Sequence, residues 1–432
     1  MQKLELLPLI QDHQFFFQNS SDLIPRIYLP SCLEGSEITF ISGPLHAGKT
    51  SFLRQLASNL KGVKIYIDFE DSRIRGSGSE SFQVIEEIAA EICKEESEKN
   101  EAGQIYYFLD EVRNVPGWEC WVDGLHRQGA GIFITSSSSI LRVGEFSSGF
   151  EGRGKILKLL PFSFKEYLLL KGARIPNPNF LTPSRSDEML CMFLQYFENG
   201  GFPAVIKNGD IRLAQKYFEE ILQQGVAAEY DIQDIRGLKK LAIFLISNMA
   251  SEYSFDTLKN VSGIENEETI RSYMNYLEDI FLLYRVPKLN HFPDREGKMD
   301  IPCKVYAGDT GFFKAVYPNY PDSLGLRFEN IVFLELLRRE KQIFYFQGQK
   351  ECDFLIKEKD SQNTSAAIQV SIYFGNPASR EREILGLMEA MEEYGLPEGL
   401  ILTMDDDETL EIEGKDGKKR IIVKSVWRWM LE

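Results

Sequence analysis

The chain has 432 residues, of which 43% are hydrophobic and 26% are charged, a composition typical of a folded protein with roughly two to four domains. The formal net charge of −16 excludes nucleic-acid binding through the overall field of the protein, although it is compatible with a local basic patch. No apolar run reaches the ~18 residues that a membrane span needs, and the N-terminus lacks the basic start and long apolar core of a signal peptide. The six cysteines form no C-x-x-C pair. The sequence therefore predicts a cytoplasmic protein without a zinc site or a disulfide framework.

The first third of the chain alternates short β-type runs with helical or loop stretches. Such alternation predicts an α/β fold in which a parallel sheet is covered on both faces. Ligands of open α/β sheets bind at the carboxyl ends of the strands. The predicted strands are Ile38–Ser42, Val63–Phe69, Ile105–Asp110, Gly131–Thr135 and Ile156–Leu159.

The strongest chemical signal follows the first of these strands. It fits the pattern G-x-x-x-x-G-K-[ST] at every fixed position and opens a predicted helix at residues 51–60. Glycines let backbone N–H groups point inward around phosphates, and the helix N-terminus adds partial positive charge. Lys49 would bring its ammonium to the β- and γ-phosphates of ATP. The predicted ATP-binding residues are Gly43, Pro44, Leu45, His46, Ala47, Gly48, Lys49, Thr50 and Ser51.

A second signal lies about 60 residues further on, where the apolar strand Ile105–Asp110 ends in Asp110-Glu111. In P-loop NTPases an acid at this place holds the shell of Mg²⁺. We therefore expect Thr50 and Asp110 to serve the metal. Glu111 is the predicted general base, which takes a proton from the attacking water.

Two further residues are weaker candidates for catalysis. Ser137 follows the strand Gly131–Thr135, where a polar side chain could orient the water or sense the γ-phosphate; the alternative is a Ser-rich loop without a role. Arg153 precedes the fifth strand, where an arginine of an AAA-type ATPase can reach a γ-phosphate, usually in a neighbouring subunit. The alternative for Arg153 is a surface or loop-bracing arginine.

The rest of the chain predicts three further regions. Apolar residues at helical spacing from Leu238, a short helix near Phe255–Val261 and a third helix from about Glu267, capped by Asn266, favour a winged-helix module. From about Leu324 the pattern returns to mixed α/β. The predicted domains are an N-terminal segment (1–33), an AAA-like P-loop ATPase domain (34–170), a helical connector (171–236), a winged-helix domain and joint (237–323) and a C-terminal domain (324–432).

Several motifs together resemble those of the predicted AAA-type ATPases of archaea and bacteria that carry a C-terminal domain of unknown function. The resemblance covers nearly the whole chain. It implies an AAA-like ATPase core, a winged-helix middle and a C-terminal fold similar to restriction endonucleases. The motifs are Phe108–Val112, Asn114–Trp118, Ile134–Ser138, Gly152-Arg153, Leu160–Glu166, Gly200–Pro203, Asp309–Gly311 and Glu329–Phe333.

The sequence departs from the family pattern in three places. Leu45 and His46 stand where relatives often have basic residues, and Arg113 replaces a glutamine that often follows the Asp-Glu strand end. In the C-terminal domain, Glu329 and Asp353 match two acids of the nuclease pattern Glu…Asp…Glu/Gln-x-Lys. There the segment Gln369–Ser371 lacks the lysine. We therefore expect this domain not to cut DNA, although Lys357 or Lys359 could in principle compensate.

These observations favour an ATP-hydrolysing AAA-type ATPase that acts as a nucleotide-driven switch or regulator, with ATP and Mg²⁺ as cofactors. The alternative is an ATP-dependent DNA-binding protein or nuclease in DNA processing or defence. The expected partners are ATP and either another protein or further copies of the chain; DNA is less favoured and no membrane is expected. Against DNA, the segment from Leu238 to Val286 carries seven acids and five basic residues.

Overall fold

The chain forms two compact units, residues 1–159 (unit 1) and residues 160–432 (unit 2), and each is described by itself. The structure is a computed structural model that describes residues 3–18, 23–27, 38–99, 104–138, 150, 154–227, 230, 232, 234–289, 302–317, 324–358 and 363–432. Over these ranges, no helix has the length and apolar character to cross a membrane.

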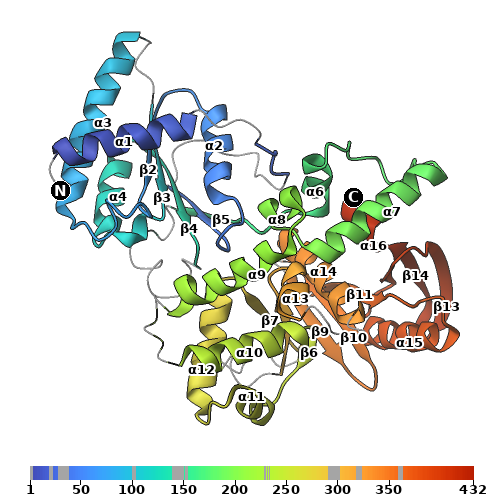
Figure 1. The fold of residues 1–432 in the computed structure, drawn as a ribbon. Coiled ribbons are helices and arrows are strands. Elements are labelled where there is room, and N and C mark those ends of the chain that lie inside the picture. Colours follow the sequence, from blue (N-terminus) through green and yellow to red (C-terminus); the bar gives the residue numbers. More distant parts are fainter. Residues whose placement is uncertain are drawn as a thin grey trace. The chain divides into compact units, whose positions relative to one another are not determined.

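Unit 1 is built on a five-stranded parallel sheet with the strand order β2-β3-β4-β1-β5 (Figure 1). Strand β1 thus lies between β4 and β5. Strand β3, which ends in Asp110, is separated from β1 by β4 alone. All five predicted strands are confirmed to within two residues. Their bounds are Ile38–Ser42 (β1), Val63–Asp68 (β2), Ile105–Asp110 (β3), Gly131–Ser136 (β4) and Gly154–Lys158 (β5).

Helices cover both faces of this sheet, because successive side chains of each strand point to opposite faces. Ile65 and Ile67 pack with α3, α4 and the first part of α1, whereas Tyr66 between them packs with α2 and with Phe17 near the end of α1. Figure 1 shows these helices around the sheet. Strands buried on both faces read as the nearly continuous apolar runs seen in the sequence. The bounds are Lys3–Gln18 (α1), Lys49–Asn59 (α2), Glu80–Lys99 (α3), Val112–Asn114 (the short helix η1) and Trp118–Arg127 (α4).

Unit 2 begins with helices and a three-stranded antiparallel sheet of order β6-β8-β7. The three helices predicted from residue 238 are α10, α11 and α12, and the side chain of Asn266 caps α12 by accepting a hydrogen bond from the Glu268 N–H. The bounds are Phe164–Leu170 (α6), Pro183–Asn199 (α7), Pro203–Asn208 (α8), Ile211–Glu220 (α9), Ile221–Ala227 (the π-helical turn η2), Ile235–Ser247 (α10), Ser251–Glu252 (β6), Phe255–Ser262 (α11), Glu267–Asp279 (α12), Leu283–Pro287 (β7) and Cys303–Ala307 (β8).

The chain ends in a six-stranded mixed sheet of order β13-β14-β12-β11-β10-β9, with α15 packed on β10, β11 and β12. The mixed α/β pattern predicted from about Leu324 is confirmed, whereas the hairpin β13–β14 was not predicted. The bounds are Gly311–Val316 (α13), Leu324–Arg338 (α14), Gln342–Gln347 (β9), Glu351–Lys357 (β10), Thr364–Ser371 (β11), Pro377–Glu393 (α15), Glu398–Thr403 (β12), Glu408–Gly414 (β13), Gly417–Ser425 (β14) and Val426–Leu431 (α16).

Two of the sequence motifs, more than 100 residues apart, form one joint inside unit 2. The carboxylate of Asp309 accepts hydrogen bonds from the Gly201 N–H at 2.7 Å and from the Gly311 N–H at 2.8 Å. Gly200 has φ 75, and a Cβ on it would lie 1.8 Å from Asp309 Oδ1. Glycine is therefore required at position 200 for both its backbone conformation and its close approach.

Candidate nucleotide-binding site

The loop between β1 and α2 has a backbone that only a few residue types adopt easily. Gly48 has φ 93 and His46 has φ 66, so the loop passes twice through the left-handed region. A Cβ on Gly43 would lie 2.0 Å from the carbonyl oxygen of Leu159, just beyond β5. Among the described residues, five non-glycine residues have positive φ, and two of them (His46 and Glu111) lie in this site. Such backbone strain clusters where function requires it.

Lys49 folds back over this loop. Its Nζ donates to the carbonyl oxygens of Gly43 and Pro44, both at 3.1 Å, and lies 3.7 Å from Glu111 Oε1. The residue is 7% exposed. The ammonium is thus held at the mouth of the loop, beside the acids at the end of β3.

Asp110 joins three elements through its carboxylate. Its Oδ2 accepts hydrogen bonds from the Thr50 hydroxyl at 2.5 Å and from the Tyr66 hydroxyl at 3.1 Å. Its Oδ1 accepts from the Thr135 hydroxyl at the end of β4. Thr50 and Asp110, the two predicted metal residues, are therefore brought together. Tyr66 and Thr135 are members of the site that sequence reasoning missed.

Glu111 is held in a buried and strained position directly after β3. Its φ is 52, and its N–H donates to the Thr135 hydroxyl at 3.1 Å. Burial raises the pKa of Glu111 to about 7, helped by the charge of Asp110 and opposed by the Lys49 ammonium and by a hydrogen bond from the backbone of Ser137. A carboxyl group with a pKa near 7 is suited to general-base catalysis at neutral pH.

The serine hydroxyl groups at and just after the end of β4 contact Arg113. The guanidinium of Arg113 donates to the Ser138 hydroxyl and, at 3.4 Å, to the Ser136 hydroxyl. The predicted residue Ser137 is half-buried and meets Glu111 through its backbone. The role assigned to the Ser137 side chain stays a prediction. Arg153, the other weak candidate, lies outside the described residues.

The donors and acceptors at this edge of the sheet of unit 1 fit a nucleoside triphosphate with Mg²⁺. Because α2 begins at Lys49, the first N–H groups of this helix have no acceptor within it and can point at phosphate oxygens. Arg26, 9% exposed, braces the loop by donating to the carbonyl oxygen of Ala47 at 3.4 Å. An oxygen-rich pair, the Thr50 hydroxyl and the Asp110 carboxylate, matches the ligands that Mg²⁺ prefers.

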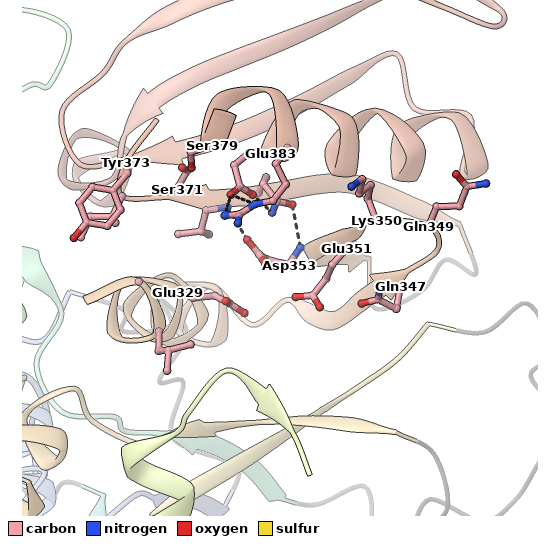
Figure 2. Close-up of a pocket in the computed structure, with 16 residues that line it drawn as sticks. Glu329, Gln347, Gln349, Lys350, Glu351, Asp353, Ser371, Tyr373, Ser379 and Glu383 are labelled. Carbon is pink, nitrogen blue, oxygen red and sulfur yellow. Dashed lines mark hydrogen bonds and ion pairs between the residues drawn. The ribbon is translucent and has the colours of Figure 1, made fainter. Parts of the chain in front are cut away.

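In unit 2, the residues of the predicted nuclease pattern line one pocket of about 480 Å³. Figure 2 shows Glu329 of α14 and Asp353 of β10 turned toward each other across it. Gln369 is engaged elsewhere: its amide donates to Glu383 at 2.6 Å and its oxygen accepts from the Asp353 N–H at 3.3 Å. Ser371 lines the wall where the pattern has its lysine.

Two sequence families match parts of the chain. Residues 35–168 match the AAA domain, and residues 192–325 match a domain of unknown function (DUF8612). The chain is 29% identical to an uncharacterized protein of Methanocaldococcus jannaschii over 92% of this chain and 88% of that protein. It is 26% identical to an uncharacterized protein of Haemophilus influenzae over 94% of this chain and 98% of that protein.

Among solved structures, the chain is similar to a Walker-type ATPase of Pyrococcus abyssi, with 12% identity, a TM-score of 0.42 and coverage of 65% of this chain and 90% of that one. The Holliday junction branch migration motor RuvB of Thermotoga maritima has 13% identity, a TM-score of 0.27 and coverage of 66% and 89%. Since both TM-scores are below 0.5, the assignment depends on the strand order and the AAA-domain match. Residues 35–168 match the AAA domain and contain the parallel sheet of a P-loop NTPase fold.

Proposed function

We propose that unit 1 binds ATP with Mg²⁺ and hydrolyses it. The observation that carries this proposal is the meeting of four side chains at one edge of the sheet. Lys49 lies 3.7 Å from Glu111, and Thr50 lies 2.5 Å from Asp110. A phosphate-binding cation, two oxygen ligands for a metal and a base are the groups that phosphoryl transfer to water requires.

Each residue has a separate task in this proposal. The loop N–H groups and Lys49 bind the phosphates, and Thr50 and Asp110 hold Mg²⁺, which neutralises charge on the phosphate oxygens when bound. Glu111 accepts the proton of the attacking water. Thr135 fixes both acids, because it contacts the Asp110 carboxylate and the Glu111 N–H.

The first prediction separates binding from chemistry. Lys49→Ala should lose most ATP binding, because the charge on the β- and γ-phosphates is removed. Glu111→Gln should keep ATP bound but lower turnover by ~10²-fold or more, the scale of a lost general base. Binding is measured with a fluorescent ATP analogue and turnover by phosphate release.

Matched controls exist on the surface of the same unit. Lys61→Ala and Glu119→Gln change exposed residues away from the loop and should leave both measurements unchanged. Near-normal ATP affinity in folded Lys49→Ala would remove the P-loop assignment. Unchanged turnover in Glu111→Gln would show that another group is the base.

We further propose that the ATPase acts as a cytoplasmic switch whose partner is a protein or a second copy of the chain. Residues 237–323 would form a winged-helix domain and joint, and residues 324–432 a restriction-endonuclease-like domain that does not cut DNA. The missing lysine at Ser371 and the bonded amide of Gln369 support the last point. Hydrogen exchange of unit 2 in Glu111→Gln, with and without ATP, tests the switch: identical exchange would contradict it.

A further inference from the structure

Next to the acids that line the pocket of unit 2 lies a buried lysine that the sequence pattern did not indicate. Lys304 lies on β8, in the three-stranded sheet, and not on β11, where the nuclease pattern has its lysine. The side chain of Asn330 on α14 fixes this strand: it accepts from the Ala307 N–H at 2.7 Å and donates to the Ala307 carbonyl oxygen at 3.1 Å. With β8 held in this register, Lys304 points toward the residue that precedes Asn330, Glu329.

Three carboxylates surround the Lys304 ammonium. Its Nζ lies 2.9 Å from Glu329 Oε1 and 3.6 Å from Asp353 Oδ1, and it also pairs with Glu351. Figure 2 shows the three acids near one another in the lining of the pocket. They line the pocket, whereas Lys304 is 2% exposed and lies behind them.

The ammonium is bonded within this cluster. An ammonium has three N–H donors. Two of those of Lys304 are directed to Glu329 and Glu351, with Asp353 next to them and the ring of Tyr345 at 5.7 Å. Lys304 is thus held against the acids and is not among the residues that line the pocket. A lysine that assisted phosphodiester cleavage would instead direct its charge toward the reacting phosphate.

The pKa shifts of this cluster result from burial, which disfavours the charged forms, and from the opposite charges, which favour them. Burial by itself would lower the pKa of Lys304, but the carboxylates of Glu329, Asp353 and Glu351 outweigh it and raise this pKa above its ordinary value. Burial raises the pKa of Asp353, and the Lys304 ammonium opposes that rise. Removal of one partner from such a buried cluster leaves uncompensated charge.

We propose that the Lys304 ammonium is the resident cation of this carboxylate site and that it excludes a divalent metal ion from it. Carboxylate oxygens are the preferred ligands of Mg²⁺ and Mn²⁺, so three of them around one point would otherwise favour a metal. The ammonium occupies that point and is covalently part of the chain. The ammonium thereby supplies the positive charge of the site without a metal, and β8 is tied to α14 and β10.

The test is to measure Mn²⁺ binding to the full chain without nucleotide, with electron paramagnetic resonance as the readout. Wild type and Asp353→Asn should bind Mn²⁺ equally weakly. Lys304→Met should gain about one bound Mn²⁺ per chain, because the acids are left without a cation, and Lys304→Met/Asp353→Asn should lose it again. Lys341→Met, which removes a lysine paired with Glu358 on the surface of the same unit, is the matched control and should behave as wild type.

Three outcomes would overturn the proposal. The first is a Mn²⁺ site in wild type that Asp353→Asn abolishes; this comparison decides the matter even if Lys304→Met does not fold. The second is folded Lys304→Met that gains no Mn²⁺. The third is metal-dependent cleavage of plasmid DNA by wild type that Lys304→Met and Asp353→Asn both abolish, which would make Lys304 part of a nuclease site.

Discussion

At the scale of single residues, Glu111 shows how a group placed for chemistry reduces stability. Its pKa is raised to about 7 in the folded protein, mainly by burial, from an ordinary value of 4.5. Between these two values the native state binds more protons than the unfolded state. Stability therefore falls as pH rises from about 4.5 to about 7 and stays at the lower level above that range.

Glu111→Gln should remove this contribution. In the nucleotide-free protein the variant should gain up to about 3 kcal/mol relative to wild type between pH 4 and pH 8, since one pKa unit corresponds to ~1.4 kcal/mol. The measurement is urea unfolding of both proteins at the two pH values. If the stability difference between the two proteins is the same at pH 4 and pH 8, burial does not raise the pKa of the Glu111 carboxyl group.

The predictable part of the site is the part that is local in sequence. The P-loop and the pair Asp110-Glu111 can each be recognised from a few consecutive residues, and the structure brings them together. Tyr66 and Thr135 could not be found in this way, because their contacts with Asp110 cross from β2 and β4. Lys304 was missed for the same reason, since it lies 25 residues before Glu329 and meets it only through β8 and α14.

At the scale of elements, α1 is a helix that the sequence did not predict. Pro8 lies inside this helix. Exposed apolar residues such as Leu4 and Phe15 interrupt the helical spacing of its buried apolar residues. Similarly, the hairpin β13–β14 was missed because many of its residues are charged. The strands of unit 1 were predicted because burial on both faces makes them continuously apolar.

Paired substitutions on α1 test whether this helix is part of the core of unit 1. Leu9 is 2% exposed and belongs to the cluster with β2 and α3, whereas Leu4 is 84% exposed. Leu9→Ala should destabilise unit 1 by about 3 to 5 kcal/mol, the cost of a cavity in a packed core. Leu4→Ala should change stability by less than ~0.5 kcal/mol. Hydrogen exchange of β2 amides reports this unit alone, and equal effects of both variants would place α1 outside the core.

At the scale of the whole molecule, charge decides between a protein partner and DNA. The net charge of −16 repels a polyanion. In the three-helix region, several basic side chains that could neutralise phosphates are already paired with acids. Lys259 lies 3.5 Å and Arg271 2.7 Å from Glu267, and Arg285 lies 2.5 Å from Glu278.

The full chain should therefore not bind duplex DNA tightly at physiological salt. The N-terminal end of a recognition helix faces the bases in helix-turn-helix proteins, and the first turn of α12 carries Glu267 and Glu268. DNA affinity depends on releasing counterions from several phosphates, which requires free basic side chains. The measurement is fluorescence anisotropy of a labelled duplex over a range of salt, together with ATP turnover with and without DNA. Tight binding with a steep salt dependence, or DNA-stimulated turnover, would favour the DNA-acting alternative over the protein-partner assignment.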